Sequence, residues 1–240
     1  SRSFVSQYIS ISEAVRIDLQ KYLAETGSDI PTVTWPLAHE FVGYDRNETS
    51  NQSSESPIVK KISKPFVLCV GTIEVRKNGA MLLAVWQQLQ KELGDKTPQL
   101  VFAGKYGWKI LPFQERLQSD TVLQHKVTVA KQVTDDDLAE LYKQCLFSVT
   151  PSLVEGWGLP IGEAAWFGKF SIVSSSSSLP EVCGNLVDYI EPNNIDEWSQ
   201  AIKRTILDDQ YRQQREKIIA QSPLRLWKDV AADLKQILAN

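Results

Sequence analysis

Strand-like and helix-like segments alternate regularly from Pro65 onward, and this alternation restricts the fold more than any other feature of the chain. Short apolar runs such as PFVLCVG at 65–71 and QLVFAG at 99–104 are typical of strands that are buried on both faces. Helical patterns follow them at 78–93 and 110–118. The alternation predicts an α/β domain with a parallel sheet flanked by helices.

The same pattern continues toward the C-terminus. It predicts, in order, a strand at KVTVA, a helix from near Thr134, a strand at LFSVTPS, a helix from Pro160, a strand at KFSIVS, and helices at 195–207, 209–220 and 224–238. Ligands of parallel sheets bind beyond the carboxyl ends of the strands. Gly71, Gly104 and residues 151–158 all follow predicted strands, so we expect them to share one rim.

The N-terminal part is less regular. Residues 4–11 and 32–37 are predicted strands, and Ser12 is expected to open a helix between them. The run 43–56 has almost no apolar side chains and is predicted to be a solvated, mobile connection. The serine run 174–178 is interpreted as a tight polar loop on the same rim as the strand ends, with a flexible tract as the alternative.

Composition excludes several classes of protein. The net charge of −3 gives no basic surface for general nucleic-acid binding. Three separated cysteines in apolar surroundings are typical of buried free thiols in a reducing compartment, and two histidines without a ligand motif argue against a catalytic metal. Because the chain has neither a signal-like start nor an apolar run long enough to cross a bilayer, a cytoplasmic location is expected.

The stretch SLVEGWGLPIGEAAWFG at 152–168 carries the most chemical information. Glycines and Pro160 separate two acids, so Glu155 is expected on a loop and Glu163 in the first turn of the following helix. Glycines before a helix start form an anion site, and a carboxylate beside it can bind vicinal hydroxyls, which together suggest a nucleotide sugar. In the alternative interpretation Glu163 only complements the helix dipole, and Glu155 is a solvated loop acid.

A second charged motif follows the first regular strand. In VGTIEVRKNG, Arg76 and Lys77 come just before a predicted helix start. The leaving group of a nucleotide-sugar transferase is a nucleoside diphosphate, and two cations can stabilise its growing negative charge in place of a metal. The alternative is a solvated basic pair in a surface loop.

Six segments in order resemble one protein family. They are VGTIEVRKNG, LVFAGKYGW, VTDDDLAELY, SVTPSLVEGWGLPIGEAAWFG, SSSSSLPEVCGN and VDYIEP. Together they are similar to the C-terminal, donor-binding half of the retaining GT-B glycosyltransferases of family GT4 (glycosyl transferases group 1), and Glu155 and Glu163 match that family's E-x7-E spacing. The resemblance covers Pro65 to the C-terminus and implies a Rossmann-like domain.

The resemblance also implies roles for individual residues. Arg76 and Lys77 would contact the donor diphosphate, Glu155 the hydroxyls of the transferred sugar, and Glu163 the ribose diol. The other expected donor contacts are the backbone of Gly156, Trp157, Gly158 and Leu159 beside phosphate and sugar, Gly71 and Thr72 where the diphosphate approaches closely, and Gly104 and Lys105 along the same cleft. Many relatives carry Arg where this chain has Thr72, so one phosphate contact is expected to be lost or moved to Arg76. Trp157 stands in place of the commoner Phe and is interpreted as packing.

The resemblance divides the chain into four segments. Residues 1–38 are similar to the closing strand and helix of the family's N-terminal domain, 39–64 would be a polar loop, 65–222 the nucleotide-sugar-binding domain, and 223–240 a helix that crosses back to the N-terminal domain. Most of that domain, with the acceptor site, is expected to be supplied in cis or in trans.

The activity implied is a retaining, metal-independent transfer of a hexose from a nucleotide sugar to a saccharide or lipid-linked acceptor, in polysaccharide biosynthesis and with peripheral association at the inner membrane face. The GKYGW loop at 104–108 is similar to that of bacterial relatives that use GDP-mannose or similar donors. A donor-binding module that is inactive without a separate acceptor domain is the second hypothesis. A third, an NAD-dependent Rossmann enzyme, is disfavoured because no GxGxxG opens the first strand–helix unit.

Overall fold

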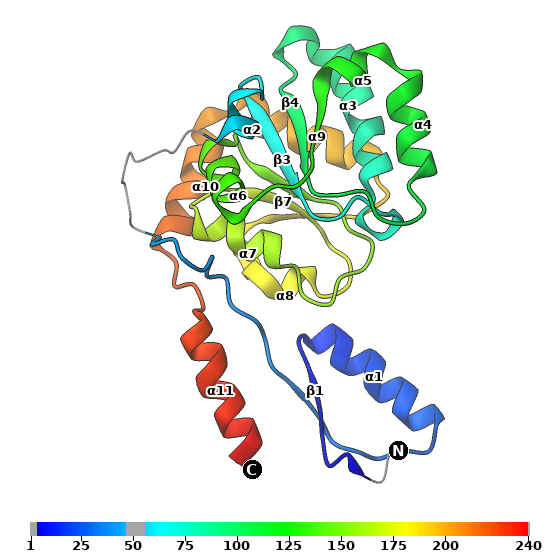
Figure 1. The fold of residues 1–240 in the computed structure, drawn as a ribbon, viewed down its shortest axis with the longest axis vertical. Coiled ribbons are helices and arrows are strands. Elements are labelled where there is room, and N and C mark those ends of the chain that lie inside the picture. Colours follow the sequence, from blue (N-terminus) through cyan, green and yellow to red (C-terminus); the bar gives the residue numbers. More distant parts are fainter. Residues whose placement is uncertain (1–3, 47–55, 240) are drawn as a thin grey trace.

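The computed structural model describes residues 4–46 and 56–239, which form a larger upper lobe and a smaller lower one (Figure 1). The larger lobe contains a six-stranded sheet in the order β5-β4-β3-β6-β7-β8, and every pair is parallel. Its strands are β3 (Phe66–Val70), β4 (Gln99–Ala103), β5 (Val127–Ala130), β6 (Ser148–Thr150), β7 (Ser171–Ser174) and β8 (Asp188–Ile190). The predicted parallel α/β sheet is confirmed.

Strand β3 shows why its sequence is apolar throughout. Phe66 and Leu68 point into the core on one face of the sheet, while Val67 and Cys69 point into the core on the other, and all four are buried. Successive side chains of a strand alternate between faces, so a strand covered on both sides needs apolar residues at every position.

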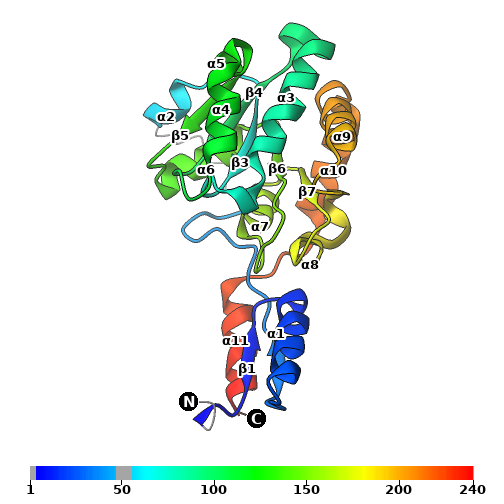
Figure 2. The same ribbon diagram turned by 90° about the vertical axis from the view of Figure 1, so that its right-hand side faces the viewer.

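Helices cover both faces of this sheet. They are α2 (Pro57–Lys60), α3 (Gly79–Leu93), α4 (Leu111–Ser119), α5 (Thr121–Lys126), α6 (Asp135–Gln144), α7 (Leu159–Trp166), α8 (Leu179–Cys183), α9 (Ile195–Leu207) and α10 (Asp209–Gln221). Buried side chains of α3, α4 and α9 pack in one core, and those of α2 and α6 in the other. Figure 2 shows α2 and α6 on one side of the strands and α9 on the other. The short helices α2, α5 and α8 have no counterpart among the predictions from the sequence.

The helix starts follow local capping chemistry. Thr134 and Asp137 form a capping box at the start of α6, which confirms the helix predicted from that point. The predicted Ser12 cap is also confirmed, because its hydroxyl accepts a hydrogen bond from the Val15 N–H at 3.2 Å at the start of α1 (Glu13–Glu25). Two side-chain oxygens therefore fix two helix starts.

The smaller lobe consists of α1, the two-stranded parallel sheet of β1 (Tyr8–Ser10) and β2 (Thr32–Thr34), and α11 (Trp227–Ala239). Both strands are shorter than predicted because they pair over three residues only, and prolines at 31 and 36 flank β2. The carboxylate of Glu181 in α8 accepts hydrogen bonds from the N–H groups of Glu13 at 2.7 Å and Ala14 at 2.8 Å. This contact joins the larger lobe to the first turn of α1.

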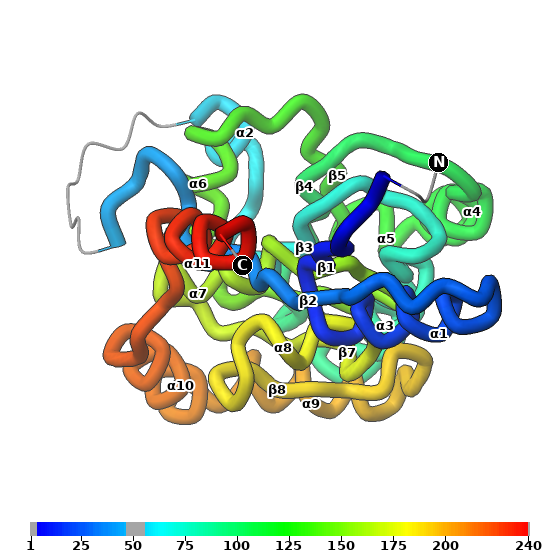
Figure 3. The backbone as a smooth tube through the Cα atoms, turned by 90° about the horizontal axis from the view of Figure 1, so that it is seen from below, coloured from blue at the N-terminus to red at the C-terminus, as the bar shows by residue number. Residues whose placement is uncertain are grey.

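Two chain segments cross between the lobes and bind each other. His39 donates its N–H to the Arg225 carbonyl, and its Nδ1 accepts the Arg225 N–H, both at 2.9 Å. These bonds hold residue 225 outside the helix, so α11 begins at Trp227 and the prediction of a helix from 224 is wrong. The Trp35 indole N–H donates to the Val230 carbonyl at 2.8 Å and ties α11 to the end of β2. Figure 3 views this crossing from below.

Residues 39–64 are not purely a polar loop. Phe41, Val59 and Ile62 are buried in the core beside α6 and α7. The predicted solvated connection falls largely on residues 47–55, which lie outside the described residues and stay a prediction. Within the described part of the chain, no helix has the length and apolar character that crossing a membrane requires.

Candidate functional site

The order of strands reverses between β3 and β6, and the loops after these two strands form the candidate site. In an open parallel sheet this reversal leaves a crevice outside the carboxyl ends of the strands. The Leu153 N–H of the second loop donates to the Arg76 carbonyl of the first at 2.7 Å. Loops that are far apart in the sequence are thereby fixed side by side.

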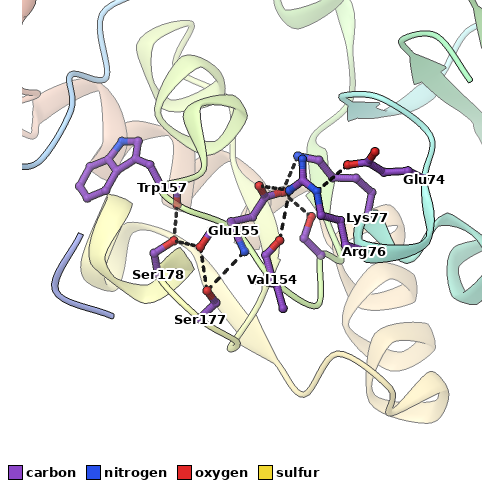
Figure 4. A network of polar contacts seen from close by, with 9 residues as sticks. Glu74, Arg76, Lys77, Val154, Glu155, Trp157, Ser177 and Ser178 are labelled. Atoms are coloured by element: carbon purple, nitrogen blue, oxygen red, sulfur yellow. Dashed lines mark hydrogen bonds and ion pairs between the residues drawn. The ribbon is translucent and has the colours of Figure 1, made fainter. Parts of the chain in front are cut away.

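Four charged side chains meet at this point (Figure 4). Arg76 and Lys77 lie in a short 3₁₀ helix before α3, and both bind the carboxylate of Glu155, with 2.8 Å between Arg76 Nη1 and Glu155 Oε2. Arg76 also pairs with Glu74. The side chain of Glu155 is 8% exposed, that of Lys77 17% and that of Arg76 41%, so the cluster is buried at its acid and open at its guanidinium.

Glu155 is held as a carboxylate. Burial alone would raise its pKa, but the charge of Lys77 and hydrogen bonds from Lys77, Ser152 and Arg76 outweigh burial and bring the pKa below its ordinary value. The Ser152 hydroxyl donates to Glu155 Oε1 at 2.8 Å. The alternative of a solvated loop acid is therefore wrong for Glu155, and a solvated basic pair is wrong for Arg76 and Lys77.

The serine run forms the tight polar loop that was predicted. The hydroxyls of Ser177 and Ser178 donate to the Glu155 carbonyl at 2.8 and 2.9 Å, and Ser178 also donates to the Trp157 carbonyl at 2.9 Å. Ser176 donates to the Leu153 carbonyl at 2.7 Å. These bonds fix the backbone of the loop that carries Glu155.

The start of α7 faces the same site. Gly158 has φ 123°, and a Cβ there would lie 2.8 Å from the Leu179 side chain, so only glycine fits before the helix. Among the described residues, no acceptor binds the N–H groups from Gly156 to Leu159. Free N–H groups at a helix start are donors for an anion, and the start of α7 lines the same cleft as the charged cluster.

Glu163 lies in the second turn of α7, so its prediction in the first turn is wrong, because the helix begins already at Leu159. Its carboxylate accepts a hydrogen bond from the Tyr142 hydroxyl at 2.9 Å. Burial raises the pKa of Glu163, with Tyr142 opposing the shift and Asp135 adding to it. Its partner is a buried tyrosine, which argues against a simple role in complementing the helix dipole.

An open cleft of about 460 Å³ lies beside these groups. It is lined by Ile11, Leu37, Arg76, Lys77, Glu155 and residues 156–160. Gly71 and Thr72 line a smaller neighbouring cavity together with Lys77 and Ser152. The structure thus brings the two cations, Glu155 and the glycine loop to one cleft, with the first strand's loop beside it.

Three residues with expected donor contacts lie outside the lining of this cleft, and their roles stay a prediction. Glu163, Gly104 and Lys105 do not line the cleft or the neighbouring cavity in the part of the chain that is described. A Cβ at Gly104 would lie 2.1 Å from the Gly71 carbonyl oxygen, so this glycine allows two loop backbones to pack closely. Trp157 is 5% exposed and belongs to the core, as the packing interpretation predicted, although it also lines the cleft.

Some functional residues were missed from the sequence. Ser152 and Glu74 bind members of the charged cluster, and Tyr142 binds Glu163. Ser152 lies three positions before Glu155, and Tyr142 ends the segment VTDDDLAELY. Neither position in the sequence indicates which side chain the residue would bind.

The chain is similar to known glycosyltransferases. The family model described as glycosyl transferases group 1 matches residues 51–223. The chain is 28% identical to the serotype-specific mannosyltransferase WbdA of Escherichia coli over 92% of its own length and 27% of that protein. It is 33% identical to the O-antigen chain mannosyltransferase B of E. coli over 65% of its own length and 42% of that protein.

A solved structure has the same fold. The glycosyltransferase from Rickettsia africae superposes with a TM-score of 0.75 at 18% identity, covering 98% of this chain and 64% of that one. The chain spans about a quarter of the length of WbdA. Since the family model covers most of the chain and the fold agrees, the chain belongs to the glycosyl transferases group 1 family.

Proposed function

We propose that this chain binds the donor of a glycosyltransferase, which moves a hexose from a nucleoside diphosphate sugar to a saccharide or lipid-linked acceptor. The observation that carries the proposal is the pairing of Arg76 and Lys77 with buried Glu155, beside N–H groups at the start of α7 that no acceptor binds among the described residues. This arrangement offers positive charge for a diphosphate and a carboxylate for sugar hydroxyls within one cleft.

The diphosphate would lie against Arg76, Lys77 and the N–H groups at the start of α7. These donors stabilise the charge that develops on the leaving group, so the proposed reaction needs no metal ion. Glu155 would accept hydrogen bonds from hydroxyls of the hexose, and Glu163 from the ribose diol. Thr72 lines the neighbouring cavity with Lys77 but carries no charge, so the positive charge for the phosphates would come from Arg76 and Lys77.

Retention of configuration is part of the proposal. Both carboxylate oxygens of Glu155 are engaged by cations or Ser152, and its pKa is below the ordinary value, so the group is a weak nucleophile. We therefore assign attack to the acceptor oxygen itself. The acceptor oxygen bonds to C1 while the C1–O bond to phosphate breaks, and the acceptor proton passes to the departing phosphate oxygen.

Mannose is the sugar that we propose, because two relatives that match this chain are named mannosyltransferases. The expected setting is polysaccharide assembly in the cytoplasm, at the inner face of a membrane, where a lipid-linked acceptor would be reached.

A panel of UDP-, GDP-, ADP- and dTDP-sugars in a thermal-shift assay tests the proposal. A ligand that binds only the folded state raises the melting midpoint. At a ligand concentration of 100 times Kd, the free energy of unfolding increases by about 2.7 kcal/mol. One nucleotide should stand out, and GDP-mannose is the expected one. No shift with any of the four, at concentrations up to several millimolar, would contradict donor binding.

A donor-binding module without activity of its own is the second candidate. Among the described residues, the segments that precede the larger lobe contribute only Ile11 and Leu37 to the cleft, and neither side chain can hydrogen-bond an acceptor sugar. Donor binding without transfer, with transfer restored by a separately added acceptor domain, would favour the module. Transfer by this chain alone would exclude it.

A further inference from the structure

Ser177 has a backbone conformation that serine rarely adopts. Its φ is 57°, in the left-handed region where a Cβ is unfavourable and glycine is free of strain. Residues held in this way persist when the surroundings compensate, and they concentrate at functional sites. A serine at this position therefore calls for a compensating interaction.

The compensation comes from the main chain of Glu155. The Ser177 hydroxyl donates to the Glu155 carbonyl at 2.8 Å and accepts from the Glu155 N–H at 3.3 Å, so one side chain binds both main-chain groups of the acid (Figure 4). Ser178 adds a second bond to the same carbonyl at 2.9 Å. Glycine would relieve the strain at 177 and would lose both bonds.

We propose that Ser177 is a positioning residue for Glu155, and that its strained conformation is retained because its hydroxyl fixes the main chain from which the Glu155 carboxylate reaches the cleft. The inference rests on the proposed function. Ser177 does not line the cleft, so its effect on turnover would pass through Glu155.

The test compares Ser177→Gly with Ser177→Ala. Both variants lose the hydroxyl, but only glycine removes the strain. The melting midpoint of Ser177→Gly should therefore exceed that of Ser177→Ala by about 2–4 °C. Both should turn over a nucleotide sugar about tenfold more slowly than the wild type, while affinity for the free nucleoside diphosphate changes less than twofold. The two variants then differ in stability but share the same loss of activity, a pattern that a role in stability alone would not produce.

Two further measurements test whether Ser177 affects turnover through Glu155. In a Glu155→Gln background, Ser177→Gly should change kcat less than twofold, because the group that it positions is already lost. Hydrogen exchange at the Glu155 amide should accelerate in both Ser177 variants, whether or not turnover is detected. Ser175 is exposed, and its backbone is not in the left-handed region. Ser175→Ala is therefore the matched control, which should leave all readouts unchanged.

The outcomes are distinguishable. Wild-type turnover in Ser177→Gly would overturn the positioning role, and so would unchanged exchange at the Glu155 amide. A wild-type chain that neither binds nor turns over any nucleotide sugar would instead reject the proposed function, and amide exchange would still decide whether Ser177 fixes Glu155.

Discussion

Replacing Glu155 with glutamine should separate three properties of this protein. Stability should fall, affinity for a free nucleoside diphosphate should rise, and turnover of the donor should fall. The reason is that Glu155 occupies the two cations that a diphosphate would otherwise bind, while it also supplies the proposed contact to the sugar.

The loss of stability can be estimated from the contacts. Glu155 accepts hydrogen bonds from Arg76 and Ser152, both at 2.8 Å, and from Lys77. Removing one partner of a buried ion pair costs about 3–5 kcal/mol. Arg76 is 41% exposed and a glutamine oxygen can still accept one bond, so we expect about 2–3 kcal/mol. For a chain of this size the midpoint should fall by about 4–12 °C.

The pH dependence gives a second check. The pKa of Glu155 lies below its ordinary value of 4.5, so its contribution to stability is complete above that pH and is lost as the pH falls through the folded value. The difference in free energy of unfolding between the wild type and Glu155→Gln should stay constant from neutral pH to about 5 and decrease below about 4.5.

Diphosphate affinity and transfer rate test the proposed function directly. Removing one negative charge beside the diphosphate should tighten nucleoside diphosphate binding about tenfold, which is about 1.4 kcal/mol. Transfer should slow by about 100-fold or more, the range for losing one transition-state contact. Calorimetry with the free diphosphate and a transfer assay measure the two effects.

Glu92→Gln is the matched control, because Glu92 pairs with Lys203 on the surface at 2.7 Å and should cost less than about 1 kcal/mol. Weaker diphosphate binding in Glu155→Gln would refute the reasoning, as would a stability gap that persists in acid.

Three further predictions concern other parts of the site. The double variant Arg76→Ala with Lys77→Ala should weaken binding of the nucleoside diphosphate by at least about 30-fold, about 2 kcal/mol, in calorimetry, and an unchanged affinity would place the phosphates elsewhere. Glu163→Gln should weaken binding of a ribonucleotide about tenfold, about 1.4 kcal/mol, but should hardly change binding of a 2′-deoxyribonucleotide. Equal losses of affinity for the two nucleotides would exclude the ribose contact. Gly104→Ala should cost about 3 kcal/mol in urea unfolding, because its Cβ would lie 2.1 Å from the Gly71 oxygen; a stable variant would show that the loops can separate.

Local chemistry made much of the larger lobe predictable. Apolar runs predicted the ends of β3 and β4 to within one residue, and α9 begins and ends at the residues predicted, 195 and 207. Signals of this kind act between near neighbours in the chain, through side-chain periodicity and capping. The errors fell where a distant contact decided the outcome, as at residue 225, where bonds to His39 replace the first turn of the predicted last helix.

Local and distant causes can also be separated for the candidate site. The sequence by itself determined which groups carry chemistry, namely the acids, the basic pair and the glycines before a helix start, because side-chain type and backbone freedom are local properties. Only the tertiary structure decided that Arg76 and Lys77 bind Glu155, which lies 78 residues beyond Lys77. That pairing depends on strand order, since β6 lies beside β3 and places their two loops together. Strand order results from packing between distant segments, which no local pattern records.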